Sequence, residues 1–181
     1  KFTILWRTFR PNMIRYTCTL LLCLVLFTAR AQDIATLPIN LQRLEAYVNK
    51  PASQVSDSLI KEGWKLNAEL SGSMDGDDYR TFSFGNLETD QKKALAWLRI
   101  HWAGTLPVNR VYYQAPDEET YTRLVEAIKA TQSTASLPQT IEGQTLTVYT
   151  GDNYVYQTIV SASTYTVVVI SKEFFTANTS P

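Results

Sequence analysis

Cysteine is almost absent from this 181-residue chain, and its two copies, Cys18 and Cys23, both fall in an apolar stretch near the N-terminus. No thiol occurs after them. Disulfide bonds and thiol catalysis are therefore excluded for the rest of the chain. A domain formed there must be stabilised by burial of apolar side chains. The 150 residues after Ala31 are enough, because a domain of this size buries roughly 70% of its unfolded surface.

Histidine and nucleotide-binding glycine motifs are also scarce. His101 is the only histidine, so a zinc site or a Ser-His-Asp triad would depend on it. No G-x-S-x-G sequence presents a nucleophilic serine. The seven glycines form neither G-x-x-x-x-G-K nor G-x-G-x-x-G. We therefore predict no metal and no cofactor, and we interpret His101 as a histidine on a sheet surface without a catalytic role.

Residues Met13 to Ala31 have the three parts of a secretory signal peptide. Arg15 provides a basic start, Tyr16 to Phe27 are mostly apolar, and Ala29-Arg30-Ala31 is an A-x-A cleavage site. As a helix, the apolar part would span about 18 Å, which is short of a hydrocarbon core of about 30 Å. We predict cleavage after Ala31, a periplasmic or secreted location and no stable membrane insertion afterwards. An uncleaved anchor is the alternative.

Removal of this segment changes the charge of the chain. Residues 1–31 hold five basic residues and no acidic one, and Lys1 to Asn12 are interpreted as a possible extension upstream of the Met13 start. The remaining 12 basic and 17 acidic residues give a net charge of −5. Nucleic acids and anionic lipids attract clustered lysine and arginine, and no such cluster is present. We therefore predict no nucleic-acid partner.

Two helices are expected within residues 37–63. The first has apolar residues at helical spacing, namely Leu37, Leu41, Leu44 and Val48. Pro51 ends it, and Ser53 is a candidate N-cap for the second helix. The inward positions of the second helix are expected to be Val55, Leu59 and Ile60. Gly63 is suited to a left-handed C-terminal position, so we predict a helical hairpin.

Alternating polar and apolar residues predict six β-strands in two groups of three. The strands are Tyr79 to Gly85, Ala94 to Ala103, Val108 to Ala115, Gln144 to Thr150, Tyr154 to Ser161, and Thr164 to Ser171. Between the groups, Asp117 is expected to cap a third helix, and Glu118 and Glu119 suit its positive end. A polar stretch, Thr131 to Thr140, joins this helix to the second group.

This succession of elements predicts an α+β fold in which helices pack on an antiparallel sheet of about six strands. The expected order is αα-βββ-α-βββ, which suggests a two-fold repeat of one helix-and-sheet unit. No linker separates two halves, so residues 32–181 are expected to form a single α+β domain.

The helical opening carries a family resemblance. Leu41 to Gly63, with Val48-Asn49-Lys50-Pro51-Ala52-Ser53-Gln54-Val55, is followed by Trp64 and three predicted strands. This pattern resembles small exported modules of the beta-lactamase inhibitor protein fold and the outer-membrane assembly lipoproteins similar to it. The likeness covers residues 32–115, with a looser copy extending to 172. It implies protein binding without catalysis, although the lipoproteins' anchoring cysteine is missing and no functional residue is carried over.

The densest acidic cluster is Asp75-Gly76-Asp77-Asp78. Calcium is held by several carboxylate oxygens on a flexible loop, and an EF-hand needs a glutamate at its twelfth position. Counted from Asp75, that position is Asn86. We therefore interpret the cluster as a solvated loop before a strand.

A candidate binding surface comes from one face of two neighbouring predicted strands. If the outer faces of these strands align, five side chains form a patch that we call the aromatic-basic patch: Trp97, Arg99, His101, Arg110 and Tyr112. Tryptophan, tyrosine and arginine are enriched at protein interfaces. Ordinary cross-strand pairing on a wetted sheet is the alternative.

The sequence thus favours an exported, non-catalytic protein-binding module that uses an open sheet face, with another envelope or secreted protein as its partner. Two alternatives stay open. One is a hydrolytic enzyme that uses carboxylates the sequence does not identify, because the separation that such enzymes need is spatial. The other is a carbohydrate-binding domain with exposed aromatic side chains.

Overall fold

The computed structural model describes residues 39–85 and 94–179. The predicted signal peptide, both cysteines and Leu37 lie outside the described residues. The described part confirms the α+β class and the antiparallel sheet, since its helices pack on one open sheet whose paired strands all run antiparallel. That sheet has nine strands, not six.

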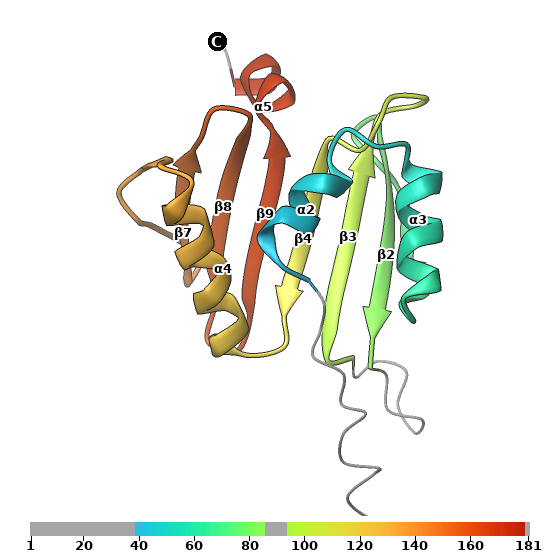
Figure 1. Cartoon of the computed structure of the whole chain (residues 1–181), viewed down its shortest axis with the longest axis horizontal. Helices are drawn as coiled ribbons and strands as arrows, with labels where there is room; N and C mark the ends of the chain where they lie inside the picture. The colour runs from blue at the N-terminus through green and yellow to red at the C-terminus, as the bar shows by residue number, and fades with distance from the viewer. Residues whose placement is uncertain (1–38, 86–93, 180–181) are drawn as a thin grey trace, which may run out of the picture. The chain divides into compact units, whose positions relative to one another are not determined.

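The helices are α2 (Leu41–Tyr47), α3 (Ala52–Lys61), α4 (Glu118–Ala130) and α5 (Lys172–Thr179). The strands are β1 (Lys65–Met74), β2 (Asp77–Phe84), β3 (Ala96–Trp102), β4 (Arg110–Ala115), β5 (Thr134–Ala135), β6 (Gln139–Ile141), β7 (Gln144–Thr150), β8 (Tyr154–Val160) and β9 (Tyr165–Ser171). Figure 1 shows α2, α3 and α4 in front of the sheet, with α5 following the end of β9.

The strands are ordered β1-β2-β3-β4-β9-β8-β7-β5, and β6 also pairs with β7. The chain therefore builds the sheet from one edge to its middle at β4. After α4 it starts again at the other edge and returns to the middle at β9. Both central strands are paired on both sides, so the centre of the sheet is fixed by residues from both parts of the sequence.

The face of the sheet covered by α2, α3 and α4 holds the main core. Leu98, Ile100, Val111 and Tyr113 are fully buried there. Trp64, directly before β1, packs edge-on against Tyr113 with 6.4 Å between ring centroids. The apolar face predicted for residues 94–103 is thus the helix-covered face, as expected from alternation in a strand.

The helix ends follow local chemistry, with one correction. The Asp117 side chain accepts a hydrogen bond from the Thr120 amide at the start of α4, as predicted, and this bond lowers the pKa of that carboxyl. Ser53 is not an N-cap, because α3 begins directly after Pro51 and Ser53 is an exposed residue inside the helix. Ile60 is 51% exposed, so its predicted inward position is also wrong. Gly63 adopts the expected left-handed conformation (φ +88°).

Four elements were not expected from the sequence: β1, β5, β6 and α5. Strand β1 is mostly exposed, so it lacks the alternation that marks a half-buried strand. The predicted polar link, residues 131–140, contains β5 and the start of β6. The predicted order αα-βββ-α-βββ is therefore wrong, because four strands follow the first helix pair, five strands follow α4, and a helix follows β9.

Candidate functional site

The strand register brings the five residues of the aromatic-basic patch to one face of β3 and β4. Trp97 lies opposite Gln114, Arg99 opposite Tyr112, and His101 opposite Arg110. Directly opposed residues of an antiparallel pair share a face, and these positions alternate with the core residues that face α2–α4. We call this side of the sheet the far face. The outer faces therefore align, which was the condition on which the patch depended.

The structure divides the patch into two parts, and His101 is the centre of the first. The His101 ring stacks on Tyr79 with 5.4 Å between centroids, and it contacts Tyr112 at 5.1 Å. Arg110 forms an ion pair with Asp77. These contacts leave His101 only 5% exposed, so its prediction as a surface histidine is wrong. The cause is Tyr79, which lies directly opposite His101 on β2 and covers its ring.

The surroundings of His101 keep its ring neutral near pH 7. Burial, followed by the charges of Arg110 and Arg99, lowers its pKa to about 4, while Asp77 acts in the opposite direction. The Nδ1 atom is buried and makes no hydrogen bond. A histidine that acts as a general base is normally oriented by a third group, such as a carboxylate. No described residue gives Nδ1 that support, so the geometry does not favour a catalytic triad.

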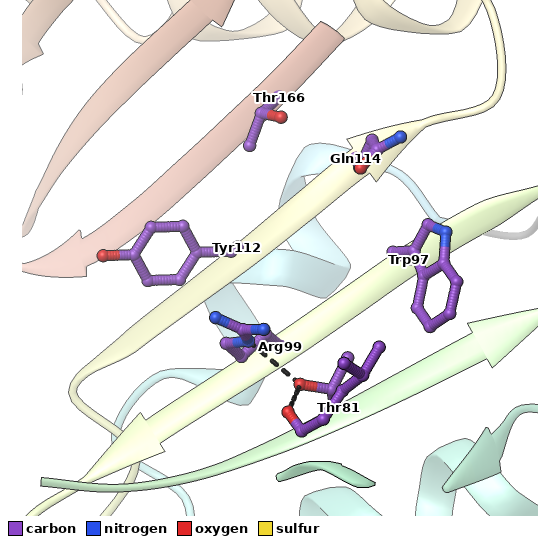
Figure 2. A pocket seen from close by; sticks show the side chains of 7 residues that line it. Thr81, Trp97, Arg99, Tyr112, Gln114 and Thr166 are labelled. Carbon is purple, nitrogen blue, oxygen red and sulfur yellow. Dashed lines mark hydrogen bonds between the residues drawn. The ribbon is translucent and has the colours of Figure 1, made fainter. Parts of the chain in front are cut away.

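The second part of the patch lines a groove of about 370 Å³ on the far face (Figure 2). Its walls come from strands β1, β2, β3, β4 and β9, and we call it the far-face groove. Its lining residues are Leu70, Thr81, Trp97, Arg99, Tyr112, Gln114 and Thr166. Figure 2 shows Arg99 in the middle of this set, with Trp97 and Tyr112 to either side of it. His101 and Arg110 are not among the lining residues.

An irregularity in β1 forms one wall of the groove. The β1–β2 register shifts between Asn67 and Gly72. The extra residues are held by local hydrogen bonds, since Ser71 Oγ donates to the Asn67 carbonyl at 2.6 Å and the Thr81 amide donates to Ser71 Oγ at 3.0 Å. Such bulges redirect side chains at sheet edges. Here the bulge brings Leu70 to the groove.

A short chain of contacts positions Arg99. Its Nε donates to Thr81 Oγ1 at 2.9 Å, and this hydroxyl donates to the Leu70 carbonyl at 2.6 Å (Figure 2). The guanidinium also lies 5.0 Å from the centre of the Tyr79 ring. Neither terminal nitrogen of Arg99 makes a hydrogen bond or ion pair within residues 39–85 and 94–179. Arg99 is thus oriented from one side, with its charge unpaired in this part of the chain.

Helix α5 covers the other half of the far face. Val155, Val168 and Ile170 form a buried cluster on β8 and β9, and Phe174 and Phe175 of α5 pack against it. The Arg110 guanidinium lies 5.0 Å from the centre of the Phe174 ring, so Arg110 stands at the border of the covered half.

The acidic cluster at residues 75–78 is a hairpin turn. Asp75 (φ +56°) and Gly76 (φ +86°) join β1 to β2 in left-handed conformations, as two-residue hairpin turns require. Asp77 pairs with Arg110, and Asp78 accepts a hydrogen bond from Ser73. The carboxylates therefore have separate partners. Among the described residues, no three His, Cys, Asp or Glu side chains are close enough to hold a metal ion.

Several groove residues were not identified by sequence reasoning. Leu70 belongs to a strand that was not predicted, and the pairing of β4 with β9, which brings Thr166 beside Gln114, joins distant parts of the chain. The sequence could have identified Thr81 as a residue of the far face, because it shares a face with Tyr79 in a predicted strand.

No helix among the described residues is long and apolar enough to cross a membrane. Comparison of the chain with protein-family models, with curated proteins and with solved structures gave no match.

Proposed function

We propose that this chain is an exported, non-catalytic binding module for another envelope or secreted protein, and that the far-face groove is its contact surface. The observation that carries this proposal is the grouping of Trp97, Arg99 and Tyr112 around one groove. These three residue types are the ones most enriched among side chains that dominate binding energy at protein interfaces.

The groove chemistry favours binding over hydrolysis. None of the described residues that line it is a carboxylate, whereas most glycoside hydrolases use a pair of carboxylates across the scissile bond. The histidine of the patch is buried outside the groove and is neutral near pH 7. The groove instead presents two aromatic rings, one cation and the amide of Gln114, a combination suited to recognition.

We also propose that the sheet is a two-fold repeat of one helix-and-sheet unit, as the resemblance to the beta-lactamase inhibitor protein fold implies. On each side of the β4–β9 pair, the chain passes from a helix to an edge strand and then inward to the centre of the sheet. Fold likeness is a weak warrant for function, so it adds to the groove argument without replacing it.

Export is part of the proposal and has its own test. When the full chain is expressed in an export-competent host, we expect the protein recovered outside the cytoplasm to begin at Gln32. Intact-mass measurement decides the matter. Recovery of the protein only in the cytoplasm or with residues 1–31 attached would contradict export with cleavage.

The contact surface is tested by cross-linking the native protein in the envelope and identifying the partner. Trp97→Ala and Tyr112→Ala are expected to lower capture of that partner by at least tenfold, as hot-spot residues do. The control is Trp102→Ala, since Trp102 is a half-buried tryptophan that alternation places on the opposite face of β3. Equal capture by all three variants would show that the groove is not the contact surface.

A further inference from the structure

The far-face groove contains one charge that the described residues leave uncompensated. Arg110, its nearest basic neighbour in the patch, is neutralised by Asp77. Arg99 has no carboxylate partner within residues 39–85 and 94–179, although a buried or half-buried arginine is stabilised by one. The Arg99 side chain is half-buried, so pairing its guanidinium with an anion would take place in a partly desolvated setting, where charge-assisted hydrogen bonds are strong.

The geometry around Arg99 also limits the number of charges that an anion can bring. The Tyr79 ring contacts the plane of the guanidinium, and the hydrogen bond to Thr81 engages its Nε edge. Its two terminal nitrogens remain, which match the two oxygens of one carboxylate. Among the described residues that line the groove, Arg99 is the single cation. A single negative charge is therefore a better match than a phosphate dianion.

The rest of the groove selects for apolar surface next to that carboxylate. Leu70, which is 45% exposed, and the Trp97 and Tyr112 rings provide most of the wall. Among the described lining residues, few polar side chains remain beyond Arg99, because the Thr81 hydroxyl already donates to the Leu70 carbonyl and accepts from Arg99. A sugar, with a hydroxyl on most of its carbons, needs more hydrogen-bonding partners than Gln114 and Thr166 can offer.

We propose that the far-face groove binds a peptide segment of the partner in which an aspartate or glutamate adjoins an aromatic or large apolar residue. The carboxylate lies against the terminal nitrogens of Arg99, and the apolar side chain lies against Trp97, Tyr112 and Leu70. This inference rests on the proposed function, since it specifies the chemistry that the partner presents to the same groove.

The test is selection of a displayed random heptapeptide library on the purified protein. The wild-type pool is expected to be enriched in an acidic residue next to an aromatic or large apolar one. A synthetic selected peptide should bind roughly tenfold more tightly than its amide counterpart (Glu→Gln or Asp→Asn), as expected for a hydrogen-bonded charge. In Arg99→Gln this difference should disappear. In Arg99→Lys part of it should remain, because the charge stays but the planar fork is lost.

The matched control is Arg123→Gln, which removes the same charge from an exposed position on α4 and should keep the tenfold preference. A selected pool without acidic enrichment, or equal affinity for the acid and amide peptides, would overturn the inference. A saturable shift of the Trp97 indole NMR signal by glucuronic acid, with none by the peptides, would do the same. So would a dimer that dissociates in Arg99→Gln, because the occupant would then be a second copy of the chain.

The outcome for this inference is separable from that for the proposed function. Loss of partner capture in Trp97→Ala but not in Arg99→Gln would leave the groove as the contact surface and remove only its acidic preference. Unchanged capture in both variants would remove the proposed function itself.

Discussion

The two halves of the far face of the sheet differ in whether a helix packs on them. Over β8 and β9, α5 packs Phe174 and Phe175 on a buried cluster. Over β2, β3 and β4, no helix among the described residues covers the sheet, and its side chains line a groove. The covered half consists mainly of aliphatic residues, whereas the groove half carries arginine, tryptophan and glutamine. The first composition is typical of a core and the second of an interface. This difference in composition agrees with the proposal that the groove half is the contact surface.

The largest effect is expected from uncovering the first half. The double variant Phe174→Ala/Phe175→Ala should lower the free energy of unfolding by about 2–4 kcal/mol, because two half-buried rings leave an apolar cluster in contact with water. Urea denaturation measures it. The control is Leu137→Ala, since Leu137 is 85% exposed and should change stability by less than about 0.5 kcal/mol. A loss as small as that of the control would mean that α5 does not serve as the cover of this half.

A comparable effect is expected from pH, through the buried His101 on β3. Its pKa of about 4 in the folded protein is below the ordinary value of 6.5. The unfolded chain therefore binds the proton more tightly. The contribution of neutral His101 is complete above pH 6.5, and it decreases as the pH falls toward 4, by about 2–3 kcal/mol over this range.

His101→Phe tests this linkage, because phenylalanine keeps a ring between Tyr79 and Tyr112 but cannot be protonated. The charged side chains that shift the pKa of His101 are Arg99, Arg110 and Asp77. They are unchanged in the variant. We expect the difference in unfolding free energy between the wild type and the variant to vary with pH between 6.5 and 4. A difference that is constant over this range would contradict the lowered pKa.

A smaller effect is expected at the border of the two halves, where Arg110 pairs with Asp77. The side chains are 26% and 13% exposed, respectively, so Asp77→Asn should cost about 1–2 kcal/mol, less than loss of a fully buried pair. It should also make the pH dependence of stability steeper, since Asp77 raises the pKa of His101. Asp78→Asn is the matched control, because Ser73 is the side chain that donates to that carboxylate among the described residues, and it carries no charge. Equal costs would mean that the Arg110 pair does not stabilise this border.

The contrast between local patterns and long-range contacts also explains which elements could be predicted from the sequence. Strand β7 has the predicted bounds, and β8 and β9 end or begin within one residue of prediction, because their alternation and turn residues are local. Strand β1 is exposed on most positions, so its pattern carries no strand period. In α5, the adjacent pair Phe174 and Phe175 does not have helical spacing, and its function as a cover depends on β8, which is distant in sequence.

The site was predicted to a similar extent and for a similar reason. The alternation in β3 and β4 was sufficient to place Trp97, Arg99 and Tyr112 on one face. Alternation could not predict how exposed each side chain is, since Tyr79 of β2 buries His101. The ion pair of Arg110 with Asp77, which spans 33 residues, divides the patch into a paired and an unpaired cation. Long-range contacts of this kind determine which patch residues are buried or paired, but they leave no mark on local periodicity.

The smallest effect is expected from removing the Tyr112 hydroxyl, which we compare with the Tyr156 hydroxyl on the opposite face of the sheet. The Tyr156 hydroxyl donates to the Glu45 carboxylate at 2.7 Å on the helix-covered face. Tyr156→Phe should cost about 1–2 kcal/mol, near the lower end for hydrogen bonds to charged groups, because this bond is only partly buried. The Tyr112 hydroxyl, at the groove, makes no hydrogen bond with a described residue, and Tyr112→Phe should change stability by less than about 0.5 kcal/mol. Thermal and urea unfolding of both variants measure the difference. If Tyr112→Phe costs as much as Tyr156→Phe, the groove side chains serve the fold. If it costs nothing, the hydroxyl is available to a ligand, as an interface requires.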